Sequence, residues 1–469
     1  MLNENSVAEL KTSLRGRLIH PGDEDYDESR KVYNGMIHKK PRLIVRCADV
    51  ADVIRSVNFA RENDLLLAIR SGGHNAGGLG ICDDGLVIDL ALMKYTRVDP
   101  AERIATVGGG CTWGDVDHAT HVFGLATPSG IISTTGVGGL TLGGGIGHLT
   151  RKCGLTIDNL LSADVVLANG TFVRATADEN ADLFWALRGG GGNFGVVTSF
   201  TFKLHPIDTV YGGPMLYELS QAAEVMKWYR DLIKLAPDDL NGYFAFLTVP
   251  PTPPFPEHFH LKKMCGIVWA CTAPLTKAEE MFKPIRAFKK AALDLVGPLP
   301  QPALQSMFDA PYPPGLQWYW RADFVKELSD EAIAQHTHFG NALPSMHSTM
   351  HLYPINGAAS RVGKNETAWS YRDATWAQVM VGVDPDPANN DKIISWTKSY
   401  YDALHPYSAG GAYVNFLMAD EGEERVKATY GDNYERLVGI KNKYDSDNLF
   451  RVNQNIKPTK KKSGTVVSA

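Results

Sequence analysis

Arg70-Ser71-Gly72-Gly73-His74-Asn75 is the stretch of this chain that decides how the rest is interpreted. It follows the apolar run 65–69, which is typical of a buried strand. Two glycines and a histidine therefore lie in a loop after a strand end, where the backbone can approach a ligand closely. Two more glycine clusters follow, at 136–147 and 187–195. Glycine at this density costs backbone entropy, and a large cofactor lying along the main chain would offset that cost.

The glycine motifs together resemble those of the berberine bridge enzyme-like flavoproteins, which belong to the vanillyl-alcohol oxidase superfamily. The motifs are Arg-Ser-Gly-Gly-His from residue 70, Gly-Val-Gly-Gly-Leu-Thr-Leu-Gly-Gly-Gly from residue 136 and Leu-Phe-Trp-Ala-Leu-Arg-Gly-Gly-Gly-Gly-Asn-Phe-Gly from residue 183. The ending at 448–456 is also similar to the last segment of that family.

The resemblance implies an α+β fold with two domains. One is a PCMH-type FAD-binding α+β domain, and the other is a substrate domain built on an antiparallel sheet with helices on one face. The resemblance assigns residues 1–206 and 410–469 to the FAD-binding domain and residues 207–409 to the substrate domain.

Local patterns in the sequence agree with this division. Asp49, with Asp52 three residues later, predicts a helix start, because a carboxylate there accepts free backbone N–H groups. Residues 163–173 predict a hairpin on a tight Asn169-Gly170 turn. After about residue 210, strand-like runs at 243–248, 266–270 and 378–382 alternate with helical stretches such as 222–233. This alternation predicts an antiparallel sheet with helices on one face.

Gly190-x-Gly192-x-x-Gly195 formally matches the dinucleotide-binding fingerprint. That fingerprint requires a strand before it and a helix after it. Here an apolar helix at 182–187 precedes it and a strand at 196–202 follows. The reversed order argues against a Rossmann domain and NAD, although the loop still suits a pyrophosphate through its backbone N–H groups.

The bulk properties are those of a soluble globular protein, with 469 residues, 44% hydrophobic and 21% charged residues and a net charge of −5. We expect neither nucleic acid nor membrane as a partner, and we expect Lys460-Lys461-Lys462 to be a solvated tail. The first residues lack the pattern of a signal peptide. The six cysteines form no Cys-x-x-Cys pair, so neither a metal site nor a disulfide framework is suggested. We expect a cytoplasmic monomer or homodimer.

His74 is the residue to which the resemblance assigns covalent FAD, through the 8α-methyl group of the flavin. The alternative is a loop histidine that only holds a turn by hydrogen bonds. Many relatives add a second bond from a cysteine before the Gly-Val-Gly-Gly motif. Ile132 occupies that place here and Cys153 lies well past the motif, so we expect a single attachment.

The FAD-binding residues that the resemblance implies come from all three glycine motifs and from the C-terminal segment. They are Arg70, Ser71, Gly72, Gly73, His74, Asn75, Gly78, Pro128, Gly130, Thr134, Thr135, Gly138, Gly139, Thr141, Gly144, Gly145, Gly195, Val197, Asn415, Asn453 and Asn455.

Two residues are candidates for opposite halves of a flavin reaction. The resemblance places Tyr413 on the substrate side of the flavin, as a base or as a residue that orients the substrate. A tyrosine needs a cationic or hydrogen-bonding neighbour to act as a base. The resemblance places Thr135 beside flavin atoms C4a and N5, where side-chain bulk controls access of dioxygen. Packing for Tyr413, and a hydrogen bond to nearby backbone for Thr135, are the alternatives.

Further catalytic candidates follow from the alternation of two strands. His351 and Tyr353 share one face of the strand at 350–354. In the resemblance that face looks at the substrate over the flavin. Gln317, Tyr319 and Arg321 likewise share one face of their strand. Core or surface packing is the alternative for each of them.

These features indicate an FAD-dependent oxidoreductase that acts on a small molecule, and an oxidase in particular. A base removes a proton from an alcohol or amine, a hydride passes to flavin N5, and dioxygen reoxidises the flavin. The alternatives are a dehydrogenase that uses another electron acceptor and a flavin-binding protein without turnover. The fold does not name the substrate.

Overall fold

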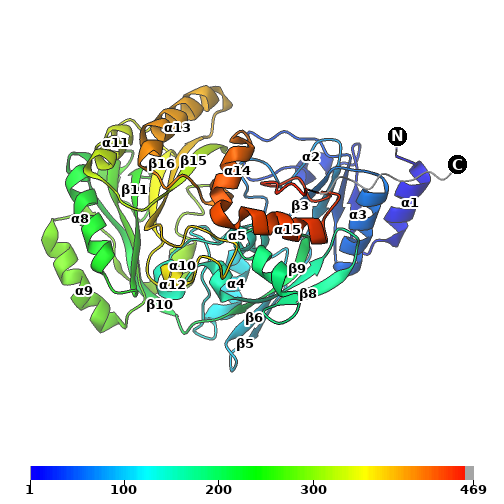
Figure 1. Cartoon of the computed structure of the whole chain (residues 1–469). Coiled ribbons are helices and arrows are strands. Elements are labelled where there is room, and N and C mark those ends of the chain that lie inside the picture. The colour runs from blue at the N-terminus through cyan, green and yellow to red at the C-terminus, as the bar shows by residue number, and fades with distance from the viewer. Residues whose placement is uncertain (1, 460–469) are drawn as a thin grey trace.

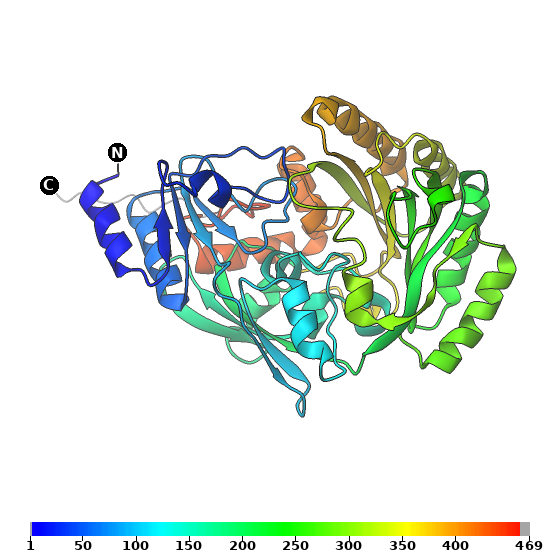
Figure 2. The same ribbon diagram turned by 180° about the vertical axis from the view of Figure 1, so that it is seen from behind.

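The fold is that of a computed structural model, in which residues 2–459 are described. Three sheets organise the molecule, with the first two at one end and the third at the other (Figures 1 and 2). The lysine run at 460–462 lies outside the described residues. Among residues 2–459, no helix combines the length and the apolar character needed to cross a bilayer.

The first sheet presents the Arg70 loop at the end of one of its strands. Its order is β1-β2-β4-β3, with β1 antiparallel and the other three strands parallel. The strands are β1 (Arg17–Ile19), β2 (Leu43–Arg46), β3 (Leu67–Arg70) and β4 (Leu86–Asp89). Helix α3 (Val50–Glu62) connects β2 to β3. Its predicted start is confirmed, because the Asp49 carboxylate accepts a hydrogen bond from the Asp52 N–H at 3.2 Å.

The second sheet is antiparallel and has the order β5-β6-β9-β7-β8. Its strands are β5 (Thr96–Asp99), β6 (Ile104–Gly108), β7 (Leu160–Val166), β8 (Phe172–Thr176) and β9 (Val196–Lys203). The predicted hairpin is confirmed, but its turn is longer than the expected two residues. The Leu167 N–H donates to the Thr171 carbonyl at 2.9 Å, and Gly170 has φ +80°. This is a three-residue loop that ends in a left-handed glycine.

The third sheet is the predicted antiparallel sheet. Seven of its strands follow the order β13-β10-β12-β11-β16-β17-β15, and β14 pairs with β10. The strands are β10 (Thr209–Glu218), β11 (Leu240–Thr248), β12 (Lys263–Cys271), β13 (Leu293–Asp294), β14 (Gly297–Pro300), β15 (Gln317–Val325), β16 (Thr349–Pro354) and β17 (Trp376–Asp384). All of them lie between residues 209 and 384, and the exact domain boundaries stay a prediction.

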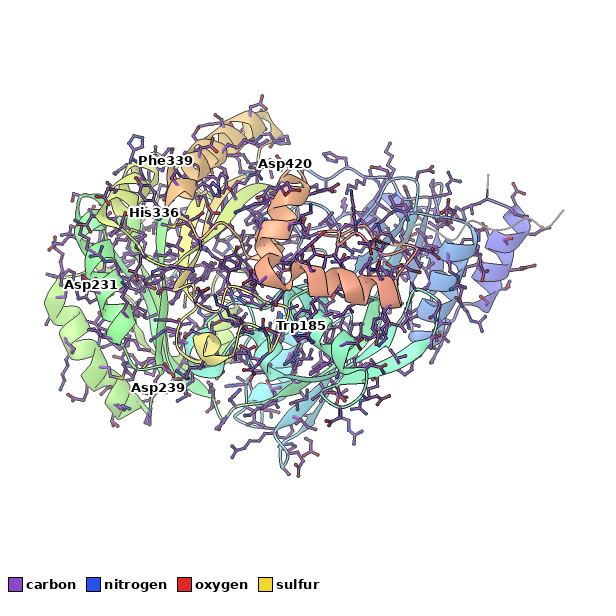
Figure 3. The ribbon with its side chains drawn as sticks, viewed as in Figure 1. Trp185, Asp231, Asp239, His336, Phe339 and Asp420 are labelled. Carbon is purple, nitrogen blue, oxygen red and sulfur yellow. The ribbon has the colours of Figure 1, made fainter. Side chains whose placement is uncertain are left out.

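Helices cover the outer face of the third sheet, as predicted. They are α8 (Ala222–Leu235), α9 (Leu275–Phe288), α11 (Asp330–Asn341) and α13 (Asn390–Leu404). Phe244 and Trp269 point into this helix-covered core, and His336 and Phe339 of α11 lie on the same side (Figure 3). Because strands alternate, Tyr243 and its counterparts face the opposite way, toward the first two sheets.

The remaining helices pack around the first two sheets and between them and the third. They are α1 (Glu4–Ser13), α2 (Tyr26–Ser29), α4 (Trp113–His121), α5 (Val137–Gly143), α6 (Thr150–Cys153), α7 (Ala181–Leu187), α10 (Gln301–Gln305), α12 (Ala358–Arg361), α14 (Gly422–Tyr430) and α15 (Tyr434–Tyr444). The Gly189–Gly195 loop lies between α7 and β9, in the predicted helix-then-strand order. After the third sheet the chain returns, and α14 and α15 lie across the middle of the molecule (Figure 1).

Candidate flavin and substrate site

A cavity of about 340 Å³ lies where the first two sheets, the inner face of the third sheet and the C-terminal segment meet. The three glycine motifs line one part of it, and the strands β15, β16 and β17 line another. The cavity therefore has a glycine-rich part, formed largely by backbone, and an aromatic part, formed by side chains.

Two glycine motifs touch each other directly in the glycine-rich part. A β-carbon at Gly72 would lie 2.4 Å from the Gly136 nitrogen, and one at Gly136 would lie 2.3 Å from the Gly72 nitrogen. Any side chain at either position would clash with backbone, so these two glycines are needed for the loops to meet. Ser71 adds a hydrogen bond from its hydroxyl to the Gly109 carbonyl at 2.7 Å.

His74 is held on several sides within this part of the cavity. The Tyr33 ring stacks on the imidazole, with a centroid distance of 3.9 Å and an interplanar angle of 18°. The Thr134 hydroxyl lies 3.2 Å from Nε2, and the Thr135 hydroxyl lies 3.4 Å from Nδ1. Enclosure by protein lowers the pKa of His74 to about 4, because desolvation disfavours the charged ring. The imidazole is therefore neutral at physiological pH.

The glycine-rich part fits FAD on grounds of shape and polarity. A β-carbon at Gly139 or Gly192 would meet no heavy atom of the chain within 4 Å, although both residues line the cavity. These positions are open toward the cavity, which suits close approach of a ligand to the backbone. The side-chain oxygen of Asn453 is buried without a hydrogen-bond partner at the same cavity, so it can accept a bond from a ligand. We infer that these residues would hold the cofactor.

Most of the predicted cofactor residues line the cavity. They are Arg70, Ser71, Gly72, Gly73, His74, Asn75, Gly130, Thr135, Gly138, Gly139, Gly195, Val197, Asn415 and Asn453. Arg70 does so with its charge already paired, because its guanidinium donates to Asp89 at 2.7 Å. Its role is therefore to join the ends of β3 and β4.

Seven predicted cofactor residues stand outside the lining, and contacts within the protein account for five of them. They are Gly78, Pro128, Thr134, Thr141, Gly144, Gly145 and Asn455. Gly78 packs on Ile37 and Gly144 on Trp369. The Pro128 carbonyl accepts a hydrogen bond from Thr156. Thr134 acts through His74, and Gly145 through Tyr413. Thr141 is fully buried, and the buried side-chain oxygen of Asn455 has no hydrogen-bond partner.

Tyr413 projects from the C-terminal segment into the junction of the two parts. Its hydroxyl accepts hydrogen bonds from the Gly145 N–H at 2.9 Å and from Asn415 Nδ2 at 2.7 Å. These donors favour the phenolate, but burial outweighs them and raises the pKa of Tyr413 to about 12. The phenol therefore keeps its proton at neutral pH, and that proton is its own remaining donor toward the cavity.

His351 and Tyr353 lie together on the inner face of β16, as their spacing predicts. The Tyr353 hydroxyl and His351 Nδ1 share a hydrogen bond of 2.6 Å. Burial lowers the pKa of His351 to about 3 and raises that of Tyr353 well above its ordinary value. At neutral pH the pair is therefore a neutral imidazole next to a neutral phenol.

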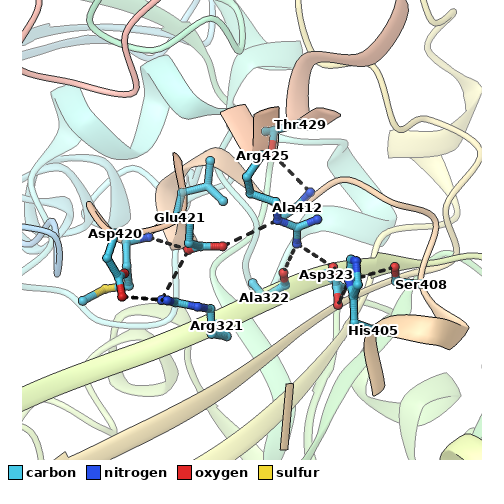
Figure 4. A network of polar contacts seen from close by, with 12 residues as sticks. Arg321, Ala322, Asp323, His405, Ser408, Ala412, Asp420, Glu421, Arg425 and Thr429 are labelled. Atoms are coloured by element: carbon cyan, nitrogen blue, oxygen red, sulfur yellow. Dashed lines mark hydrogen bonds and ion pairs between the residues drawn. The ribbon is translucent and has the colours of Figure 1, made fainter. Parts of the chain in front are cut away.

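Gln317, Tyr319 and Arg321 do not face the cavity, whereas Trp318 and Trp320 do. For Gln317, Tyr319 and Arg321, packing away from the cavity is therefore the correct alternative. Tyr319 and Arg321 each donate to Asp420 at 2.8 Å. Both belong to a polar network that joins β15 to the start of α14, and Figure 4 shows the contact between Arg321 and Asp420.

A second half of that network is centred on Arg425 of α14. Its guanidinium contacts the buried Asp323 of β15 at 2.5 Å and Glu421 at 3.5 Å (Figure 4). His405 also lies 3.2 Å from Asp323. The network joins α14 to the third sheet and so supports the neighbouring segment that carries Tyr413 and Asn415.

Sequence reasoning missed several residues of the aromatic part. Tyr33, Phe308 and Tyr312 line it from loops, and their positions follow no periodic pattern. The Tyr33 hydroxyl donates to the Tyr312 carbonyl at 2.5 Å, so the ring that stacks on His74 is also tied to the substrate side. The six cysteines are free thiols, and none of them lines the cavity in the described residues 2–459.

Comparison with known proteins gives matches along nearly the whole chain. The family described as FAD binding domain matches residues 41–176, and the family described as Berberine and berberine like matches residues 412–457. An FAD-linked oxidoreductase of Dictyostelium discoideum is 33% identical over 461 residues, which cover 96% of this chain and 97% of that one.

Two further matches are to proteins named as 6-hydroxynicotine oxidases. (R)-6-hydroxynicotine oxidase of Paenarthrobacter nicotinovorans is 42% identical over 195 residues, which cover 42% of this chain and 43% of that one. The crystal structure of 6-hydroxy-D-nicotine oxidase from Arthrobacter nicotinovorans superimposes with a TM-score of 0.84 at 26% identity. That match covers 95% of this chain and 98% of the other.

Proposed function

The chain belongs to the berberine bridge enzyme-like family of FAD-linked oxidoreductases, and on this premise we propose that it oxidises an alcohol or amine group of a small molecule with dioxygen as the electron acceptor. Membership confirms the predicted fold class, FAD as the cofactor and an oxidoreductase activity. It sets aside the alternative of a flavin-binding protein without turnover. The observation that carries the proposal is that the same cavity is lined by His74 and Thr135 and by three further residues, His351, Tyr353 and Tyr413.

Covalent attachment of FAD through His74 is part of the proposal. A ring nitrogen needs a free lone pair to bond the 8α carbon, and the lowered pKa of His74 keeps the imidazole neutral. The stacked Tyr33 ring and the Thr134 hydroxyl hold the imidazole in one orientation. Because no cysteine lines the cavity in residues 2–459, we expect no second attachment through a cysteine.

The chemistry that FAD supplies when bound is acceptance of a hydride from the substrate carbon and delivery of two electrons to dioxygen. The substrate also loses a proton from its oxygen or nitrogen. Dioxygen takes up two electrons and two protons and leaves as hydrogen peroxide, so atoms and charge balance. The chain's own residues have to position the substrate, handle its proton and admit dioxygen.

Tyr413 is our first candidate for handling the substrate proton. Its hydroxyl is fixed by two N–H donors, so its remaining proton can orient the substrate heteroatom. The pair of His351 and Tyr353 is the second candidate. Neutral His351 has a basic ring nitrogen, and Tyr353 holds the ring through the 2.6 Å hydrogen bond. Removal of one acid–base group typically slows a reaction about 10²–10⁴-fold.

The lining of the aromatic part supports an uncharged ring system as substrate. Trp318, Trp320, Tyr353 and Phe416 present ring faces and edges to the cavity. The similarity to (R)-6-hydroxynicotine oxidase, which is named for a ring compound, supports a ring system as substrate. Thr135 is small, which leaves room for dioxygen beside the position proposed for the flavin.

An anaerobic screen of alcohols and amines tests the proposal. The holoenzyme is mixed with each compound, and loss of the absorbance band of the oxidised flavin reports reduction. We expect cyclic or aromatic alcohols or amines to bleach the flavin and admission of air to restore the band within seconds. A bleached flavin that stays reduced in air would favour the dehydrogenase, and an unbleached flavin throughout would contradict the substrate class.

A further inference from the structure

A second cavity of about 300 Å³ lies beside the first, on the same face of the third sheet. Its walls come from Pro214 of β10, from the proline-rich loop at 250–255, from Leu295 and from the loop at 307–311. Phe308 lines both cavities, so its side chain stands between them.

The segment Met307–Tyr312 forms the wall that separates the two cavities. Phe308 and Tyr312 line the first cavity, whereas Met307, Ala310 and Pro311 line the second. Asp309 in the middle of this segment accepts a hydrogen bond from the Ser133 N–H at 2.9 Å. Ser133 lies next to Thr134 and Thr135, so the wall is tied directly to the loop that contacts His74.

The chemistry of the second cavity selects against polar ligands. Its lining consists of prolines, Phe255, Phe308, Leu295, Met307 and Ala310, with Thr252 as its polar side chain. Proline has no backbone N–H, so this wall offers few hydrogen-bond donors. A polar group placed here would lose its water without compensation, while an apolar group would gain from burial. Thr252 and Ala310 are exposed, so the cavity opens toward solvent at its outer rim.

We propose that the second cavity is a subsite for an apolar arm of the substrate, an alkyl or aryl extension that passes the Phe308 wall while the reacting group lies in the first cavity. This proposal rests on the proposed function, because it assumes that the first cavity holds the reacting end. Because Phe308 lines both cavities, they lie one side chain apart, and this short separation favours a single ligand that reaches both. The substrate would then be an amphiphilic molecule with a polar reacting end and an apolar tail.

The test is a binding series that needs no turnover. Linear 4-alkylbenzamides, from methyl to octyl, carry no alcohol or amine that the enzyme could oxidise. Their Kd for the holoenzyme is measured by isothermal titration calorimetry. We expect each methylene that enters the second cavity to lower Kd about fourfold. Absence of binding by every member, or a Kd that does not change with chain length, would overturn the proposal.

Two variants fill the second cavity from opposite walls, Ala310→Trp and Leu295→Trp. Each should abolish the gain for the longer chains and leave the Kd of the methyl compound unchanged. Ala303→Trp is the matched control, because Ala303 is exposed on the neighbouring α10 and lines neither cavity. It should retain the full chain-length dependence. Retention of that dependence in both cavity-filling variants would also overturn the proposal.

The outcome is independent of the oxidase activity. Chain-length dependence without flavin bleaching by any alcohol or amine would leave the subsite in place and contradict the proposed reaction. Bleaching without chain-length dependence would do the reverse.

Discussion

Replacement of Gly139 by alanine separates binding of the cofactor from folding of the chain. A β-carbon at Gly139 would meet no heavy atom of the protein within 4 Å, yet the residue lines the cavity. The added methyl group therefore enters the space proposed for FAD without a clash inside the protein. Because Gly139 lies within α5, alanine should also stabilise the helix by about 0.5–1 kcal/mol.

The expected effect on FAD is opposite to the effect on folding. Insertion of a methyl group into a filled site costs about 1–3 kcal/mol, which weakens binding about 5- to 150-fold. The measurement uses the His74→Ala background, in which we expect FAD to be bound but dissociable. Quenching of flavin fluorescence gives Kd for His74→Ala with and without Gly139→Ala, and thermal unfolding of the apoproteins reports stability.

Gly439→Ala is the matched control. Gly439 also has no heavy atom within 4 Å of an added β-carbon and also lies within a helix, α15, but it does not line the cavity. It should leave the Kd for FAD unchanged. Equal Kd values with and without Gly139→Ala in folded proteins would refute the placement of the cofactor, as would an equal loss in the Gly439→Ala control.

Four other substitutions probe the reaction, a buried carboxyl and the support of the site. Tyr413→Phe should slow anaerobic flavin reduction about 10²–10⁴-fold and leave reoxidation nearly unchanged, whereas Thr135→Leu should slow reoxidation alone. Rapid-mixing absorbance measures both steps, and equal reduction rates in Tyr413→Phe and the unmodified protein would direct attention to His351 and Tyr353. Burial, with a contribution from Asp309, raises the pKa of Asp117 to about 8 in the folded protein. The unfolded chain releases this proton near pH 4, so the free energy of unfolding decreases as pH rises from about 4 to about 8. Asp117→Asn should accordingly raise the thermal midpoint at pH 8 and barely change it at pH 4, and a pH-independent difference would contradict this. Arg425→Met leaves Asp323 buried without its closest cation and should cost about 3–5 kcal/mol in urea unfolding, whereas a loss below 1 kcal/mol (about the value of an exposed pair) would show that the network contributes little.

Much of the cofactor site could be predicted from the sequence, because glycine motifs carry local information. The order of helix and strand around Gly189–Gly195, the cap at Asp49 and the shared face of His351 and Tyr353 all follow from short-range patterns. The direct contact between Gly72 and Gly136 does not, because it joins segments about sixty residues apart.

The aromatic part was harder to predict for a physical reason. Alternation along β15 shows which residues share a face, but it does not show which face turns inward, because large apolar side chains stand on both. Trp318 and Trp320 line the cavity, and Tyr319 is buried on the other face against the α14 network. Tyr33 and Phe308 come from loops, where packing partners depend on tertiary contacts rather than on periodicity.

Mass spectrometry of the tryptic peptide Ser71–Lys94 tests the central claim most directly. This peptide contains His74 and also Cys82, so fragment ions have to assign the modified residue. We predict that acid-precipitated protein stays yellow and that the peptide carries the flavin on His74 alone. An unmodified Ser71–Lys94 peptide from flavin-loaded protein, or a flavin located on a cysteine, would contradict the account.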